Sequence, residues 1–389
     1  MKHDSSWLED PTVFAVNRIP AHSDHTFYTE ESQALRSEKM PLRMSLNGSW
    51  KFHYAENPSL SVADFFKAEM DCSPWADIQV PGHIQLQGYD QCQYTNVTYP
   101  WDGYSPIKPP EVSWEYNPVG SYVKYITVPS NFQGKRVYLS LQGAESACYV
   151  WLNGHFVGYG EDSFTPSEFE VTPFLQEGEN KLAVQVYKRC SGSWLEDQDF
   201  WRFSGLFREV YLYAVPETHI NDLFVHTDLS LDFQEACLRV RLSLQGKLPA
   251  KGRAVLRDPE GTIVAQQEES LRENSEFSMT LHDPRLWSAE VPNLYTLLLY
   301  VYDSQGRLVE VVPQKIGFRR FEIVDGLMRL NGKAIEFRGI NRHEFDCRRG
   351  RAVTREAMEY DIRFLKRLSL IHISICARNS RSSNGRSYK

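Results

Sequence analysis

Residues 148–159, CYVWLNGHFVGY, decide the fold of this chain. An apolar run leads into Asn153-Gly154, and a second run with aromatic and aliphatic residues follows it. Because Asn-Gly accepts positive φ at both positions, it favours a two-residue turn whose twist matches that of two flanking strands. The stretch therefore predicts a β-hairpin.

Short β-rich runs separated by turn signals surround this hairpin. Residues 122–128 and 136–141 precede it, and helical periodicity is scarce up to Val215-Pro216. Further along, strands spaced by polar turns are predicted at residues 236–244, 253–257 and 295–302. The pattern predicts a jelly-roll β-sandwich followed by an immunoglobulin-like β-sandwich.

A third block opens at about Arg320 and has a different character. An Asn-Gly hairpin is predicted at residues 326–333, and residues 335–340 predict a buried strand. Thr354 can cap a helix whose apolar face repeats with helical spacing at Met358, Ile362, Leu365 and Leu368. Strand, loop and helix make one βα unit, which alone cannot bury both faces of a parallel strand.

The composition excludes several classes of function. A formal net charge of -7 over 389 residues argues against a nucleic-acid-binding surface. The N-terminus has no apolar run of the signal-peptide type, and no segment approaches membrane-spanning length. The 7 cysteines are scattered, which indicates free thiols in a reducing compartment. We therefore expect a cytoplasmic protein that binds neither nucleic acid nor membrane.

The stretch that most suggests a functional site is residues 195–210, LEDQDFWRFSGLFREV. Its carboxylates alternate with aromatic rings and are followed by Arg202 and Arg208. Acidic hydroxyl acceptors beside flat apolar rings suit a sugar-binding surface. The same residues also suit a structural salt-bridge corner between two strands, because buried carboxylates need partners. On residue types alone both interpretations stay open.

Several motifs together resemble the family 2 glycoside hydrolases, and specifically the bacterial β-galactosidases of the lac type. They occur in family order at family-like spacing over about residues 7–368: YTNVTYP at 94–100, GYGEDS at 158–163 with PSEF at 166–169, LEDQDFWR at 195–202, LWSAEVPNLY at 286–295 and RGINRHE at 338–344. The resemblance implies a jelly-roll sugar-binding domain, an immunoglobulin-like domain and a TIM barrel. In such a barrel the active site lies at the C-terminal ends of the strands.

The resemblance also implies roles for individual residues. Asn96 and Asp199 are expected to contact galactose, and Asp199 is also expected to help hold a sodium ion. His343 is expected to stabilise the transition state, while Glu196 and Asp197 shape the loop. Taken alone, Asn96 also suits a turn, Asp199 a salt bridge to a nearby arginine, and His343 a hydrogen-bonded strand end.

The resemblance stops short of the catalytic carboxylates. In this family both catalytic glutamates and the main magnesium ligands lie later in the barrel, and they are absent from this sequence. Residues 369–389 are rich in Ser and Arg, which favours an out-of-frame or adaptor-derived tail joined to a truncated gene. The expected organisation is an extended arm at 1–41, the jelly roll at 42–216, the immunoglobulin-like sandwich at 217–319, an incomplete barrel at 320–368 and the tail at 369–389.

We therefore expect a mainly β protein that descends from a β-galactosidase. Such an enzyme hydrolyses terminal β-D-galactose residues of β-galactosides such as lactose by retaining double displacement. Without the two glutamates, the chain is expected to be inactive alone. The alternatives are a non-catalytic galactoside-binding module, a complementation fragment and a sequencing artefact. Full-length relatives are often homotetramers, and the sequence does not fix the oligomeric state of this chain.

Overall fold

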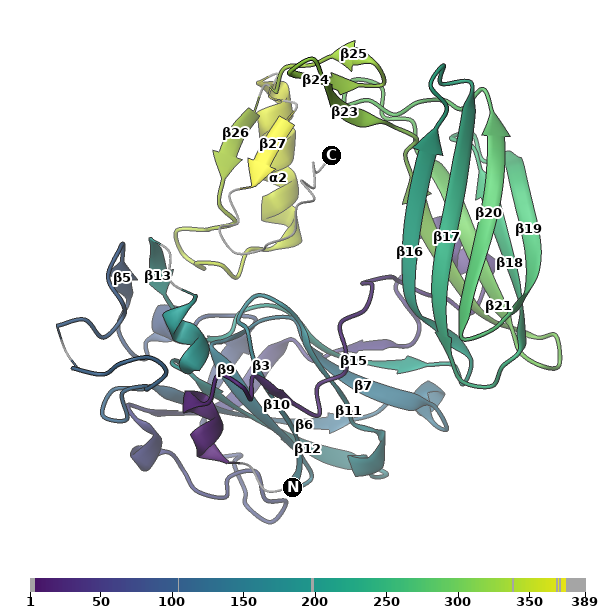
Figure 1. Ribbon diagram of the computed structural model, residues 1–389. Helices are drawn as coiled ribbons and strands as arrows, with labels where there is room; N and C mark the ends of the chain where they lie inside the picture. The colour runs from purple at the N-terminus through teal and green to yellow at the C-terminus, as the bar shows by residue number, and fades with distance from the viewer. Residues whose placement is uncertain are drawn as a thin grey trace.

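Two β-sandwiches and a short α/β segment follow one another along the chain (Figure 1). The computed structural model describes residues 4–103, 105–196, 199–337, 339–368, 370 and 372–375. The prediction that residues 369–389 are an out-of-frame or adaptor-derived tail therefore concerns mostly residues outside the described part. Within the described part, no helix is long and apolar enough to span a membrane.

The first sandwich pairs a seven-stranded sheet, in the order β1-β10-β9-β12-β6-β3-β4, with a four-stranded sheet, β11-β7-β15-β2. The hairpin predicted at Asn153-Gly154 is confirmed, with φ of 51° and 83° at its two turn residues. The strands are β1 (Ala15–Val16), β2 (Arg43–Ser45), β3 (Gly48–Ala55), β4 (Ala76–Val80), β6 (Val119–Thr127), β7 (Arg136–Leu141), β9 (Ala147–Leu152), β10 (His155–Glu161), β11 (Ser167–Glu170), β12 (Glu179–Tyr187) and β15 (Val210–Val215).

Two short ribbons extend this sandwich at one end. β5 (Gln93–Thr95) pairs with β13 (Phe200–Arg202), and β8 (Ala144–Glu145) pairs with β14 (Gly205–Leu206). In Figure 1 the β5–β13 ribbon stands away from the main sheets, on the side that faces the α/β segment. Residues that the sequence analysis singled out as sugar contacts lie at the tip of this ribbon.

The second sandwich is more regular. It packs the sheet β16-β17-β20 against the sheet β19-β18-β21-β22. Along β17, alternate residues from Ala236 to Leu244 are buried and their neighbours face outward, the pattern of a strand with one side on the core. The strands are β16 (His219–Leu229), β17 (Glu235–Gln245), β18 (Ala250–Arg257), β19 (Ile263–Leu271), β20 (Asn274–His282), β21 (Tyr295–Tyr302) and β22 (Leu308–Ile316).

The N-terminal arm lies across both sandwiches. Trp7, in the 3-10 helix η1 (Ser5–Glu9), stacks on Tyr149 of β9 with ring centroids 6.0 Å apart. Tyr28 then forms a β-bridge with Val311 of β22, and α1 (Glu31–Arg36) contacts the same strand. The arm thus ties the two sandwiches together.

The α/β segment begins with the hairpins β23 (Phe321–Val324), β24 (Leu327–Leu330) and β25 (Lys333–Ala334). The strand expected at 335–340 instead forms at β26 (Gly339–Arg342), because the backbone N–H of Ile335 still bonds Met328 of β24. The helix α2 (Arg355–Arg367) begins where predicted, with the Thr354 hydroxyl accepting from the Ala357 N–H.

The barrel pattern continues past the expected boundary at 368. β27 (His372–Ile375) pairs with β26 in parallel, so β26, α2 and β27 form a complete βαβ unit. The α2 residues Tyr360 and Phe364 are exposed, whereas Leu365 is buried. This unit has a helix on one face and apolar side chains still open to solvent.

Candidate functional site

The β5–β13 ribbon brings together two of the predicted site residues. Cross-strand pairing places Phe200 opposite Thr95, and the next step of the register brings Asp199 to Asn96. The Asp199 N–H donates to the carbonyl oxygen of Asn96 at 3.0 Å. Both side chains are exposed at the tip of the ribbon. Asn96 and Asp199 are therefore direct neighbours in the structure, although they lie far apart in the sequence.

The two faces of the ribbon differ in character. Tyr94 and Trp201 are cross-strand partners on one face, 51% and 40% exposed, with ring centroids 5.5 Å apart. On the other face, the Arg202 Nε donates to the Thr95 hydroxyl at 2.9 Å. The buried face therefore fixes the ribbon, and the exposed face offers aromatic rings beside the Asn96 and Asp199 polar groups.

Asp199 has an unusual backbone and one side-chain partner from the ribbon. Its φ of 36° lies in the left-handed region, which Asp and Asn tolerate better than most residues. The Tyr94 hydroxyl donates to Oδ1 of Asp199, and this bond raises the pKa of the tyrosine. A bond to Oδ1 leaves lone pairs of the carboxylate available for the hydroxyl of a ligand. Tyr94 is not among the site residues expected from the sequence, although it opens the YTNVTYP motif.

Glu196 holds the base of the same loop. Its two carboxylate oxygens accept from the N–H and the hydroxyl of Ser163, at 2.8 and 3.0 Å. Burial raises the pKa of Glu196 to about 7. Its backbone oxygen accepts from Arg202 at 2.6 Å. Glu196 thus shapes the loop, as the sequence predicted, whereas Asp197 lies outside the described residues.

His343 follows β26 directly and is exposed. In the described part of the chain, no hydrogen bond or ion pair joins it to Asn96 or Asp199. The segment after it does reach the first sandwich, because Phe345 stacks near Phe203 with ring centroids 6.3 Å apart. The structure therefore brings Asn96 and Asp199 together and connects His343 to them only through this segment.

The described residues meet only part of what a metal ion requires. Among them there is no group of three or more His, Cys, Asp or Glu side chains able to hold a metal. Asp199 offers hard carboxylate oxygens of the kind that alkali and alkaline-earth ions prefer, one of which already accepts from Tyr94. Sodium at Asp199 therefore needs further ligands, and magnesium has no matching set in the described chain.

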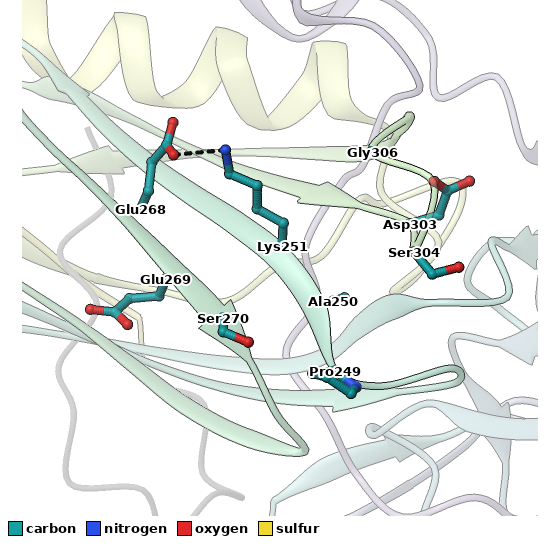
Figure 2. Close-up of a pocket in the computed structure, with 9 residues that line it drawn as sticks. All are labelled: Pro249, Ala250, Lys251, Glu268, Glu269, Ser270, Asp303, Ser304 and Gly306. Atoms are coloured by element: carbon teal, nitrogen blue, oxygen red, sulfur yellow. Dashed lines mark ion pairs between the residues drawn. The ribbon is translucent and has the colours of Figure 1, made fainter.

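A hollow lies elsewhere, on the second sandwich. It measures about 510 Å³ and is bordered by β18, β19 and the turn after β21 (Figure 2). Its Lys251 and Glu268 side chains already pair with each other at 2.8 Å. None of the described residues that line this hollow comes from the ribbon, so the ribbon remains the candidate site.

Models of one protein family match the chain in succession. The sugar binding domain of the glycosyl hydrolases of family 2 matches residues 43–216, a second family 2 model matches 218–319, and the family's TIM barrel domain matches 321–375. These matches confirm the predicted mainly β fold class and the order of its parts. The third match includes β27, in agreement with the βαβ unit.

Curated relatives agree with the family match. A beta-galactosidase of Clostridium acetobutylicum is 54% identical over 368 residues, which cover 94% of this chain and 41% of the relative. One of Streptococcus thermophilus is 49% identical over 93% of this chain and 35% of its own length. A beta-galactosidase large subunit of Leuconostoc lactis is 39% identical, covering 93% and 60%. The chain thus spans about two fifths of the length of the first relatives.

Solved structures show the same fold. A Bacteroides uniformis beta-glucuronidase superposes with a TM-score of 0.72 at 25% identity, over 88% of this chain and 40% of that one. A Bifidobacterium dentium beta-glucuronidase superposes with a TM-score of 0.68 at 23% identity, over 85% and 57%. At this level of identity the likeness supports the architecture and not the choice of sugar.

Proposed function

Because the chain belongs to family 2 of the glycosyl hydrolases, we propose that it is the galactoside-recognising part of a β-galactosidase. Identity of 54% to a named beta-galactosidase over 94% of the chain supports galactose over other sugars. The observation that carries the proposal is the pairing of Asn96 with Asp199 at the exposed tip of the β5–β13 ribbon.

The ribbon tip has the chemistry that a sugar requires. Asn96 offers a donor and an acceptor, and Asp199 accepts from hydroxyl groups. Tyr94 holds one oxygen of Asp199, so the carboxylate meets the ligand in a fixed orientation. A sodium ion at Asp199 would supply positive charge beside the sugar hydroxyls, with its further ligands from outside the described ribbon. His343 would donate a hydrogen bond as charge develops.

Hydrolysis with retention needs two carboxyl groups roughly 5 Å apart, one as acid/base and one as nucleophile. Neither of the two glutamates that the family resemblance implies is present among the 389 residues. We therefore propose that this chain binds a β-galactoside weakly and does not turn it over. Release of nitrophenol from nitrophenyl β-galactoside above background by the purified chain would contradict this part of the proposal.

Calorimetry with galactose tests recognition directly. The matched variants are Asp199→Asn, which keeps a residue that tolerates positive φ, and Asp232→Asn in an exposed turn of the second sandwich. We expect the wild type and Asp232→Asn to give the same heat, and Asp199→Asn to bind at least tenfold more weakly. Equal heats for all three proteins would remove the ribbon tip as the galactose site.

Cellular location and assembly remain proposals. We propose that the protein is cytoplasmic, that it has no nucleic-acid partner, and that its full-length relatives form homotetramers. Six cysteines of the described chain are free thiols, which agrees with a reducing compartment: Cys72, Cys92, Cys148, Cys190, Cys237 and Cys347.

A further inference from the structure

The loop between β26 and α2 docks into the first sandwich at the base of the β5–β13 ribbon. Asp346 and Gly350 bond each other's backbones at 2.8 Å, which closes the loop into a tight turn. Gly350 has a φ of 60°, and a Cβ there would lie 2.8 Å from His83 and 3.0 Å from Phe203. Only glycine allows this close approach of the loop.

Arg351 enters the sandwich next to this glycine and is only 9% exposed. Its backbone N–H donates to Nε2 of His83 at 3.1 Å. Its guanidinium donates to a carboxylate oxygen of Glu145 on β8 and, at 2.8 Å, to the carbonyl oxygen of Trp201 on β13. Through its backbone N–H and its side chain, this one residue of the α/β segment thus holds three separate segments of the first sandwich.

Aromatic rings enclose the same guanidinium. Its carbon lies between 4.3 and 5.6 Å from the centroids of four phenylalanine rings: Phe164, Phe200, Phe203 and Phe207. A cation over ring faces is attracted to them, most strongly where water is excluded. The rings therefore select a planar cation at this position and exclude the solvent that would screen its pair with Glu145.

The acceptors of Arg351 connect the two halves of the candidate site. Trp201 lies on β13, which begins directly after Asp199, and residues 344–350 lead from Arg351 straight back to His343. A buried ion pair adds little net stability, because both charges lose their hydration, and its best-attested use is to select one arrangement. We propose that Arg351 is a positioning residue that fixes the β5–β13 ribbon, and with it Asp199, relative to His343.

His83 makes this docking sensitive to pH. Its Nε2 accepts from Arg351 only when that nitrogen carries no proton. Burial and the neighbouring Arg351 charge lower the pKa of His83 well below its ordinary value, and Glu145 is the acid that faces it, 4.0 Å away. Its ring stacks on Phe203 and Phe207, so a charged imidazole has no room to reach water. Docking should weaken in acid.

Amide hydrogen exchange in the full chain tests the proposal without requiring activity. In Arg351→Met, we expect exchange to rise at least tenfold in peptides covering 199–206 and 343–352, with no change in 235–245 of the second sandwich. Arg349→Met, an exposed residue of the same loop, is the matched control and should leave all three peptides unchanged. Unchanged exchange at 199–206 in Arg351→Met would overturn the proposal.

Two further readouts separate positioning from general stability. Arg351→Lys keeps the charge and loses the fork that reaches Glu145 and Trp201 together, so it should show an intermediate rise, and it decides the question if Arg351→Met does not fold. In the wild type, the same two peptides should exchange faster at pH 5 than at pH 7 after correction for intrinsic rates. Exchange that rises evenly over the whole chain in both variants would show a merely structural role.

The expected effect of Arg351 on sugar binding rests on the proposed function. The experiment below distinguishes failure of the positioning role from failure of the proposed function. If the wild type binds nitrophenyl β-galactoside, Arg351→Lys should bind it at least threefold more weakly at an unchanged melting temperature. Equal binding by the two proteins would overturn the positioning role. Absence of binding by the wild type would contradict the proposed function instead, and hydrogen exchange would still decide the role of Arg351.

Discussion

The two β-sandwiches solve the same packing problem and differ in what they bury. The second sandwich alternates buried apolar and exposed polar residues along strands such as β17, with short turns between them. The first sandwich also buries charged side chains at one end, among them Lys188, Arg202 and Glu145, where Arg351 of the α/β segment pairs with Glu145. Those charges lie beneath the ribbon that carries Asn96 and Asp199, so at this end of the sandwich buried charge accompanies the candidate site.

The difference shows that packing a core and positioning a ribbon require different side chains. A sandwich core needs only apolar residues at every second position. Holding an exposed ribbon at a defined position requires directional bonds, and these require buried polar partners. The hollow of the second sandwich illustrates the contrast, because its ion pair between Lys251 and Glu268, seen in Figure 2, joins two exposed side chains.

The largest expected effect comes from breaking the buried ion pair of the first sandwich. Glu145→Ala leaves Arg351 charged and buried without its carboxylate, which should lower the free energy of unfolding by about 3–5 kcal/mol. The matched change Glu268→Ala breaks an exposed pair with Lys251, with side chains 55% and 58% exposed, and should cost at most about 1 kcal/mol. Urea unfolding measures both; comparable losses would erase the contrast between the sandwiches.

Tryptophan fluorescence suits this measurement. All tryptophans except Trp287 lie in the arm or the first sandwich, so the change in fluorescence emission reports mainly on the unfolding of that sandwich. Unfolding of the second sandwich, which contains Trp287 alone, is followed by circular dichroism.

A smaller effect is expected from adding a methyl group at a turn. Gly350→Ala places a Cβ against His83 and Phe203 at a positive φ, and should cost about 2–3 kcal/mol. Gly306→Ala, in a turn of the second sandwich, has a similar φ of 76° but open space around it, so only the backbone cost of about 1 kcal/mol remains. Melting temperatures compare the two; an equal cost would mean that the loop is not docked in solution.

A third effect concerns a buried acid at the junction of the sandwiches. Glu310 on β22 accepts from the Ile220 N–H at 2.8 Å, and burial raises its pKa from 4.5 to about 8. A raised pKa means that its contribution to stability is fully present below pH 4.5 and is lost as the pH rises through 8. Glu310→Gln has no proton to lose, so it should gain at least about 1 kcal/mol on the wild type between pH 5 and 9.

Calorimetric melting across that range measures this difference. Glu276→Gln, on the exposed face of β20, is the control and should follow the wild type at every pH. A constant offset between Glu310→Gln and the wild type would show that Glu310 does not change its protonation in this range.

The smallest effect on stability is expected at the ribbon tip itself. Asp199→Asn keeps the left-handed backbone and changes an exposed side chain, so its unfolding free energy should stay within about 0.5 kcal/mol of the wild type. A loss comparable to that of Glu145→Ala would show that the tip is structural. The account separates the two ends of the ribbon, with recognition at the tip and stability at the base.

Local signals in the sequence were sufficient for much of the fold. Asn153-Gly154 placed the β9–β10 hairpin, alternation placed β17, and Thr354 placed the start of α2. The strand expected at 335–340 was misplaced because the bounds of β26 depend on its pairing with β27. The sequence did not predict β27, because it lies in the Ser- and Arg-rich segment that was interpreted as a tail.

The site was less accessible to the sequence, for a physical reason. Asn96 and Asp199 were identified as site residues from the family resemblance. Nothing in the local sequence around either residue shows that their backbones are hydrogen-bonded to each other. The contact of Arg351 with Glu145 joins residues far apart in the chain, and no periodicity or local motif announces it. Tyr94 was missed because a tyrosine at a strand end suits packing as well as it suits orienting a carboxylate.

The most direct test of the account is a galactose titration followed through the backbone amide signals of the labelled protein. The account predicts that signals of Asn96, Asp199 and Trp201 shift together with one dissociation constant, while signals of β17 stay fixed. Shifts confined to the hollow bordered by Lys251 and Glu268, or no shift at the ribbon at saturating galactose, would contradict it.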